Sequence, residues 1–245
     1  MIENYQAADD LLKDKVILIT GAGDGIGKSA ALTYAKHGAT VILLGRTTEK
    51  LEQVYDEIEA QGGPQPAIIP VNLLNLSIEQ AQQIGEKILS EFGRLDGLLH
   101  NASQLGQLSP IDSYNDEHWL NIMQVNVNAT FFLTKALLPA LRQSPAASVI
   151  FTSSGVGNKG RAFWGAYSVS KFATEGFAQV LADELEKSNI RVNTINPGAT
   201  RTKMRAKAYP VEDPMTVKTP AEIMPLYLYL MGADSAEVHG QRIDA

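Results

Sequence analysis

The 245-residue chain contains no cysteine, which excludes disulfide bridges and thiolate metal sites. Its histidines are few and widely separated, without metal-ligand spacing, so we expect no bound metal. No apolar run reaches the ~18 residues of a membrane span. Acidic side chains outnumber basic ones by 27 to 21, and the net charge of −6 gives no general attraction to nucleic acid or anionic membranes. The four histidines are His37, His100, His118 and His239.

The first residues, 1–5, also lack the basic and apolar regions of a secretory signal, so we expect a cytoplasmic protein. Apolar residues make up 44% of the chain, enough for a substantial core. The length suits one large α/β domain over 1–245, and no internal repeat or low-complexity tract divides it.

Short apolar runs alternate with longer amphipathic stretches, a pattern typical of βαβ units. Strands this apolar are usually covered on both faces, so the sequence predicts a Rossmann-type, doubly wound parallel sheet with helices on either side. The expected strands are 16–19, 41–44, 67–71, 95–100, 148–152 and 190–195, and 240–243 could add an edge strand. The expected helices are 26–37, 48–61, 78–92, 116–142, 164–187 and 221–231.

The segment 198–218 is the longest stretch for which no element is predicted. Loops of this length are uncommon inside a compact domain, so we expect either a lid over a functional site or a poorly ordered segment. A solvated surface segment is the ordinary alternative, and the sharper interpretation is a lid that favours an anionic substrate or covers the phosphates of a cofactor. Its charged residues are Arg201, Lys203, Arg205, Lys207 and Lys218 against Glu212 and Asp213.

A glycine-rich stretch, Thr20–Gly27, follows the first expected strand and opens the first expected helix. Gly21, Gly25 and Gly27 would let backbone N–H groups approach a pyrophosphate at the positive end of the helix dipole. Their spacing, G-x-x-x-G-x-G, departs from the common G-x-G-x-x-G pattern, and a tight turn without a ligand is the alternative.

The residues after the second expected strand indicate which dinucleotide is bound. A fold selective for NAD usually carries an acid about 20 residues beyond the glycines. This chain has Leu44-Gly45-Arg46-Thr47-Thr48 there, without an acid. Arg46 and Thr47 could instead bind the 2′-phosphate of NADP, whereas a solvated arginine at a helix start is the alternative. Asp24 counts mildly against a 2′-phosphate site, because it could lie near the same phosphate. We therefore predict a preference for NADP over NAD.

Three further residues carry a possible proton-transfer site. Tyr167 and Lys171 lie four residues apart and would share one helix face, where a nearby ammonium lowers the tyrosine pKa of about 10. Ser154 follows an apolar strand, so its hydroxyl would emerge at the carboxyl edge of the sheet and could donate to a substrate carbonyl. Each residue alone is more often structural. Together they predict hydride transfer between a nicotinamide and a carbonyl or alcohol.

These motifs resemble those of the short-chain dehydrogenase/reductase family, and the resemblance extends from Val16 to Ile243. It implies that Asn126 joins Ser154, Tyr167 and Lys171 in a catalytic tetrad, anchoring a water that relays protons to the lysine. It also implies that the lysine binds the nicotinamide ribose. The cofactor-binding residues implied are Gly21, Asp24, Gly25, Ile26, Gly27, Arg46, Thr47, Asn72, Leu73, Asn101, Ala102, Tyr167, Lys171, Pro197, Gly198, Thr200 and Thr202.

The sequence departs from the family's pattern at a few positions. The stretch His100-Asn101-Ala102-Ser103 resembles the family's Asn-Asn-Ala-Gly, with departures at His100 and Ser103. Asn72 stands where the family often has an aspartate facing the adenine, and its amide oxygen could still meet the adenine amino group. The residues expected at the substrate pocket are Gln104, Leu105, Val156, Phe163 and Trp164.

Within the family, four stretches resemble the bacterial YciK-type oxidoreductases, a group without a firmly assigned substrate. Family members bury the helices equivalent to 116–142 and 164–187 in a two-fold interface, so we expect a homodimer or homotetramer. An NADP-binding sensor or scaffold with little turnover is the alternative function. A sugar-nucleotide epimerase or dehydratase needs an added C-terminal domain, for which too few residues follow Gly198. The four stretches are 123–131, 171–176, 196–202 and 224–228.

Overall fold

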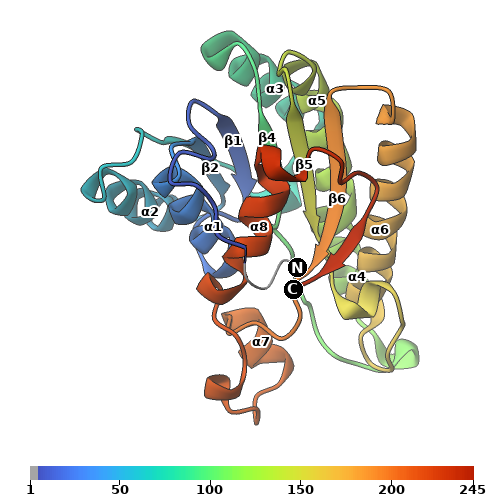
Figure 1. Ribbon diagram of the computed structural model, residues 1–245. Coiled ribbons are helices and arrows are strands. Elements are labelled where there is room, and N and C mark those ends of the chain that lie inside the picture. The colour runs from blue at the N-terminus through green and yellow to red at the C-terminus, as the bar shows by residue number, and fades with distance from the viewer. Residues whose placement is uncertain (1–4) are drawn as a thin grey trace.

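The computed structural model describes residues 5–245 (Figure 1), so most of the start used to predict a cytoplasmic protein, residues 1–4, lies outside the described part. A seven-stranded sheet runs through the molecule in the order β3-β2-β1-β4-β5-β6-β7. Every neighbouring pair is parallel. This confirms the predicted doubly wound, Rossmann-type α/β fold.

The strands form where the chain is most continuously apolar. The strand β5 is buried along its whole length, whereas the edge strands β3 and β7 are only partly covered. Because successive side chains point to opposite faces, Leu18 enters one core and its neighbours Ile17 and Ile19 enter the other. The strands are β1 (Val16–Thr20), β2 (Thr40–Gly45), β3 (Ala67–Pro70), β4 (Gly97–His100), β5 (Ala147–Thr152), β6 (Ile190–Asn196) and β7 (Arg242–Asp244).

Two layers of helices cover the sheet (Figure 1), and each layer closes its own hydrophobic core. One core takes residues from α1 (Gly25–Lys36), α2 (Thr48–Ala60) and α8 (Met224–Met231). The other takes residues from α3 (Ile78–Phe92), α5 (Ala129–Arg142) and α6 (Gly165–Leu185). Within residues 5–245, no helix is long and apolar enough to cross a membrane.

The long helix predicted over 116–142 is interrupted. It consists of α4 (Asp116–Met123), a π-helical turn over Gln124–Asn128, and α5. Such a turn inserts an extra residue and rotates the side chains that follow it, and π turns are frequent at functional sites. Here it places Asn126 in the interior, where 4% of its surface is exposed.

The segment 198–218 is more regular than predicted. It contains α7 (Lys203–Ala208) and a short 3-10 turn over Pro214–Thr216. The segment is closed at its base by a bridge between Thr200 and Lys218. The expectation of a stretch without secondary structure was therefore wrong. Figure 1 shows α7 beyond the carboxyl edge of the sheet, which is the position a lid would need.

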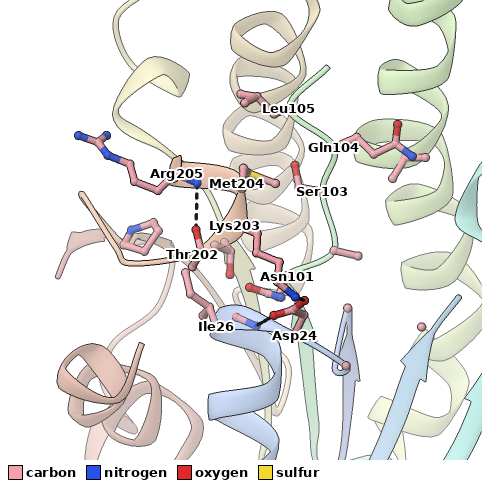
Figure 2. A pocket seen from close by; sticks show the side chains of 18 of the residues that line it. Asp24, Ile26, Asn101, Ser103, Gln104, Leu105, Thr202, Lys203, Met204 and Arg205 are labelled. Atoms are coloured by element: carbon pink, nitrogen blue, oxygen red, sulfur yellow. Dashed lines mark hydrogen bonds and ion pairs between the residues drawn. The ribbon is translucent and has the colours of Figure 1, made fainter. Parts of the chain in front are cut away.

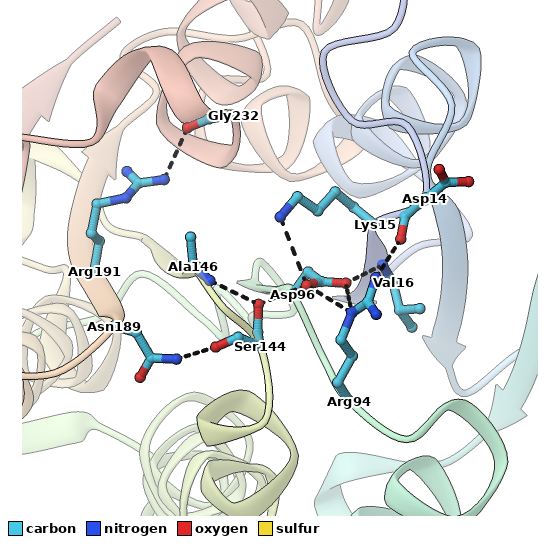
Figure 3. Close-up of polar contacts among 10 residues, drawn as sticks. All are labelled: Asp14, Lys15, Val16, Arg94, Asp96, Ser144, Ala146, Asn189, Arg191 and Gly232. Carbon is cyan, nitrogen blue, oxygen red and sulfur yellow. Dashed lines mark hydrogen bonds and ion pairs between the residues drawn. The ribbon is translucent and has the colours of Figure 1, made fainter.

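A buried carboxylate organises the opposite, amino-terminal edge of the sheet (Figure 3). Burial alone would raise the pKa of Asp96, but hydrogen bonds from the Ser144 hydroxyl, the Val16 N–H and the Arg94 guanidinium hold it below its usual range. These bonds tie together the starts of β1, β4 and β5. We therefore assign this charged cluster a structural role.

Candidate active site

A cleft of about 530 Å³ opens where six neighbouring strands, β3 to β6 in sheet order, reach their carboxyl ends. This is the edge where open parallel sheets bind ligands. Gly27 and Asn126 do not line it. The predicted site residues that do line it are Gly21, Asp24, Gly25, Ile26, Arg46, Thr47, Asn72, Leu73, Asn101, Ala102, Ser154, Tyr167, Lys171, Pro197, Gly198, Thr200 and Thr202.

Two glycines of the loop are required for different structural reasons. Gly21 has φ +69°, a left-handed conformation that residues with a side chain rarely adopt, and it packs closely on the backbone of Ala102. A side chain at Gly27 would collide with the Gly21 carbonyl and the Asn101 amide. Gly27 therefore lets α1 pack against the loop rather than touching the cleft itself.

Thr20 joins the glycine loop to the loop after β4. Its hydroxyl accepts hydrogen bonds from the backbone N–H groups of Asn101 and Ala102, both at 3.0 Å. The Asn101 amide donates in return to the Thr20 carbonyl at 3.4 Å. The pair Asn101-Ala102 thus fixes the floor of the cleft between β1 and β4.

The end of the cleft where β2 stops is rich in charge. The Asp24 carboxylate caps α1 by accepting from Gly25 N–H at 2.9 Å, and its Oδ2 accepts from the ammonium groups of Lys203 and Lys50. These two lysines, Lys203 more than Lys50, lower the pKa of Asp24 to about 2. Figure 2 shows Asp24 at the start of α1 facing Lys203 on the segment above.

The other predicted residues at this end make fewer side-chain contacts. Arg46 is exposed at the cleft mouth, and the following Thr47 precedes α2 without capping it through its side chain. Asn72 uses its amide oxygen to accept from Leu74 N–H at 3.2 Å, which caps a 3-10 turn. Lys50 was not singled out from the sequence, and Lys203 was named only among the charged residues of the segment 198–218, because nothing in the spacing of either lysine marks it.

At the other end of the cleft, α6 presents Tyr167 and Lys171 from one face, and both are buried, with 7% and 4% of their surfaces exposed. Burial raises the pKa of Tyr167 to about 12, with the neighbouring Ser154 hydroxyl acting in the opposite direction. The predicted lowering of the tyrosine pKa is therefore wrong for this structure. The Lys171 ammonium lies 5.6 Å from the centre of the tyrosine ring and donates instead to the Thr152 carbonyl at 2.7 Å.

Burial acts on Lys171 as well. It lowers the pKa of the ammonium to about 8, and the Glu175 carboxylate one helical turn away acts in the opposite direction. Glu175 is itself held by the Thr194 hydroxyl at 2.9 Å and the Arg242 guanidinium at 3.2 Å. A lysine with this pKa can exchange its proton near neutral pH, which an exposed lysine does not readily do.

Asn126 lies behind the cleft and acts as a clamp. Its amide nitrogen donates to the Gln104 carbonyl at 3.0 Å and to the Ser170 hydroxyl at 2.9 Å. Its amide oxygen accepts from Gln104 N–H at 2.8 Å. The side chain thus ties the loop after β4 to the turn of α6 that carries Lys171. In this arrangement Asn126 positions the site.

An apolar chamber adjoins Tyr167. The Trp164 ring stands between the rings of Tyr167 and Tyr209, with centroid distances of 5.8 and 5.9 Å. Phe163, expected in this pocket, does not line the cleft and is 56% exposed, so that prediction was wrong. Gln104, Leu105 and Trp164 do line the cleft, and Val156 packs in the chamber wall. The chamber is the apolar part of the cleft lined by Leu105, Trp164, Tyr167, Met204 and Ala208, and Leu108 and Val156 belong to the same hydrophobic cluster without lining the cleft.

The departures from the family's pattern have separate consequences. His100 is stacked on Phe151 and shares a 2.8 Å hydrogen bond with the Thr134 hydroxyl, and burial lowers its pKa to about 3. It is therefore a neutral core residue. Ser103 and Ser153 line the cleft with buried hydroxyl oxygens that have no hydrogen-bond partner among the described residues.

These features fit a dinucleotide. The glycine loop leaves room for a pyrophosphate, and the unpartnered serine hydroxyls could bond a polar ligand. Among the described residues lining the cleft, Asp24 is the one carboxylate, and no group of histidine and acidic side chains anywhere in that part of the chain could hold a metal ion. The cleft-lining cations are Arg46, Lys50, Lys171, Lys203 and Arg205.

Comparison with known proteins identifies the family to which the chain belongs. The model of the short chain dehydrogenases matches residues 15–213. The chain belongs to the short-chain dehydrogenase/reductase family. The oxidoreductase YciK of Escherichia coli K12 is 57% identical over 242 residues, which cover 99% of this chain and 96% of that protein. This confirms the predicted resemblance to the YciK-type oxidoreductases, and the protein is an oxidoreductase of this family.

Solved relatives share the fold and carry a cofactor. A short-chain dehydrogenase of Shigella flexneri 2a in complex with NADP is 56% identical, with a TM-score of 0.95, and the match covers 97% of this chain and 99% of that one. A short-chain dehydrogenase of Escherichia coli CFT073 in complex with NADPH has the same identity, TM-score and coverage. Those two relatives therefore bind NADP or NADPH.

Proposed function

We propose that the protein transfers a hydride between the nicotinamide of NADP(H) and a carbonyl or alcohol substrate, with Tyr167 as the general acid/base. The observation that carries this proposal is the convergence of Ser154, Tyr167 and Lys171 at the buried end of a cleft whose other end suits a dinucleotide. When bound, NADPH supplies the hydride, and the protein supplies orientation and proton transfer.

Each residue has a definite part in the reducing direction. Tyr167, with a pKa near 12, holds its proton at neutral pH and can donate it to the substrate oxygen as negative charge develops there. The Ser154 hydroxyl can donate a hydrogen bond to the same oxygen. The Lys171 ammonium, 5.6 Å from the ring centre, stabilises the phenolate left behind. In the oxidising direction the same proton returns to Tyr167.

The cationic end of the cleft supports the choice of NADP. Arg46 stands beyond the last residue of β2, where the family places the adenine ribose, and its guanidinium can pair with two phosphate oxygens. Gly45 offers no carboxylate that would repel a 2′-phosphate. The relatives solved with NADP and NADPH are 56% identical to this chain and support the same choice.

The chamber beside Tyr167 supports an apolar substrate. Its wall contains Leu105, Trp164 and Met204, and Arg205, which stacks on the Tyr209 ring, is neutralised by Glu212. We therefore propose that the part of the substrate next to the carbonyl is uncharged and hydrophobic.

The outer face of the two helices expected to form a two-fold interface carries exposed apolar residues. Phe131 on α5 and Val169, Phe172 and Val180 on α6 are each at least 44% exposed. We propose that a second copy covers this face, giving a homodimer or homotetramer, in the cytoplasm as the sequence predicts. Light scattering at micromolar concentration tests the assembly, and a monomeric mass would contradict it.

A panel of carbonyl compounds with NADPH tests the proposed function. Purified full-length protein is incubated with NADPH and a series of hydrophobic ketones, aldehydes and oxo acids, and absorbance at the NADPH band is followed. We expect steady oxidation with some uncharged ketones or aldehydes and much slower oxidation with oxo acids of similar size. NADPH binding without turnover across the panel would favour a sensor or scaffold instead.

A further inference from the structure

A single carboxylate oxygen at the cleft mouth joins three distant segments of the chain. Oδ2 of Asp24, in the glycine loop, accepts from the ammonium of Lys50 at 2.7 Å and from that of Lys203 at 2.8 Å. Lys50 belongs to the first turn of α2. Lys203 begins α7 in the segment 198–218 (Figure 2). The two ammonium groups are thus held side by side by one acceptor.

The backbone of the first turn of α2 packs against the glycine loop next to the Asp24–Lys50 ion pair. A side chain at Gly23 would approach the Lys50 Cβ to 3.0 Å and the Leu51 side chain to 3.5 Å. The first turn of α2 therefore rests on the loop, which places the Cβ of Lys50 beside the cleft. The same turn follows Arg46 and Thr47, which lead from the end of β2.

The charges in this cluster do not balance. Lys50 and Lys203 contribute two positive charges against the one negative charge of Asp24. Arg46, which lines the same cleft, adds a third positive charge, so these four residues carry +2 in a chain whose net charge is −6. One carboxylate oxygen shared by two ammonium groups leaves their mutual repulsion partly uncompensated. A phosphate dianion would neutralise the cluster and offer several acceptor oxygens in place of one.

We propose that Lys50 and Lys203 are residues that select NADP, and that Asp24 holds both ammonium groups at the cleft mouth until the 2′-phosphate replaces it as their acceptor. This inference rests on the proposed NADP preference. Because Lys203 belongs to the segment 198–218, binding of the 2′-phosphate also holds that segment over the cleft. The segment then acts as a lid that recognises the phosphate absent from NAD.

The simplest competing view treats the three residues as a surface ion pair with a helix cap. Exposed ion pairs contribute little to stability, and Asp24 would be explained by its bond to Gly25 N–H alone. The two interpretations predict different effects of Lys50 and Lys203 on the affinity for a ligand that carries a 2′-phosphate. Adenosine 2′,5′-bisphosphate carries that group and 5′-AMP lacks it, so the pair isolates the interaction from the pyrophosphate and the nicotinamide.

Isothermal titration of the full-length protein with these two nucleotides tests the proposal. We expect Lys50→Gln to weaken the bisphosphate by ~10-fold or more and Lys203→Gln to weaken it by at least ~3-fold, with 5′-AMP changed less than about twofold. Lys50→Arg keeps the charge and should retain most of the affinity. Lys28→Gln is the matched control, because Lys28 pairs with Glu57 across the same helices α1 and α2 but outside the cleft.

Asp24→Asn separates the charge from the cap. Asparagine caps a helix as well as aspartate does, but it does not repel a phosphate, so the variant should bind the bisphosphate roughly 3–10-fold more tightly. The proposal is overturned if Lys50→Gln and Lys203→Gln weaken both nucleotides alike, or neither. If the wild type does not distinguish the two nucleotides, the NADP preference itself fails, which is a different result. Thermal melting of each variant confirms that it is folded.

Discussion

Two lysines of the same cleft show opposite behaviour. Lys203 is exposed at the mouth, and its contact with Asp24 raises the pKa of its ammonium above the usual value. Lys171 is buried at the other end, and desolvation lowers its pKa to about 8 although Glu175 opposes the shift. The comparison shows that position, rather than residue type, sets the pKa of a lysine in this cleft, and it agrees with the proposal of a charge-binding end and a proton-transfer end.

The physical basis of the difference is water. At the mouth, the charged side chains are in contact with water, which screens their interactions with one another and stabilises their charges. At the buried end, apolar side chains surround Tyr167 and Lys171, and each group shifts toward its neutral form. A buried tyrosine that keeps its proton and a lysine that can lose one near neutral pH are suited to general acid/base catalysis.

Removing the buried charge of Lys171 should cause the largest loss of turnover. We expect Lys171→Met to lower turnover by at least ~10²-fold, because the phenolate of Tyr167 would lose its stabilising ammonium. Steady-state rates at saturating NADPH measure the loss. Lys28→Met, which removes a cation outside the cleft, serves as the control. Equal losses in both variants would show that the effect is a general loss of charge.

Removing a charge at the mouth should change binding and spare chemistry. A hydrogen bond between charged groups contributes roughly 1.5–3 kcal/mol, so Arg46→Ala should weaken NADPH binding by about one to two decades. NADH binding should hardly change, because NADH lacks the 2′-phosphate. Fluorescence titration of both cofactors against both proteins measures the difference. Equal affinity of the wild type for NADH and NADPH would contradict the assignment.

The pH dependence of the reaction provides a finer test of the buried end. The rate of carbonyl reduction should fall as pH rises through about 8, because Lys171 then loses the proton that stabilises the phenolate. Tyr167 keeps its proton to about pH 12 and does not set this limb. Glu175→Gln removes the carboxylate that raises the lysine pKa, so the limb should move to lower pH, with roughly a few-fold change in rate near pH 8.

The same lysine affects stability with a definite sign. Between about pH 8 and its ordinary pKa of 10.5, Lys171 binds a proton in the unfolded chain but not in the folded one. The free energy of unfolding should therefore gain from this group as pH rises through that window. A pH profile for the Glu175→Gln variant that matches the wild type would show that the carboxylate does not influence Lys171.

The strands and most helices could be predicted because their apolar runs follow simple periods. The break in the helix 116–142 could not, since a π turn over 124–128 adds one residue without disturbing the apolar pattern enough to be noticed. The helix α7 has six residues, fewer than two turns, which is too short to show a helical period. Both of these unpredicted features lie beside the cleft. Local sequence patterns are often broken at functional sites.

For the candidate site, the sequence predicted residues with a motif and missed those without one. Tyr167, Lys171 and the glycine loop carry recognisable spacing, and the structure brings them to one cleft. Lys50 and Lys203 have no such spacing, and their meeting at Asp24 depends on three segments folding together. The direction of the Tyr167 pKa shift was missed for a related reason, because burial is set by the tertiary structure.

The central claim is that charge at the mouth binds the cofactor while the buried tyrosine moves the proton. Measuring turnover and NADPH affinity together in Tyr167→Phe tests it most directly, since phenylalanine keeps the ring and removes the proton donor. The account predicts a loss of at least ~10²-fold in turnover with NADPH affinity changed less than about twofold. Turnover near that of the wild type on a verified substrate would contradict it.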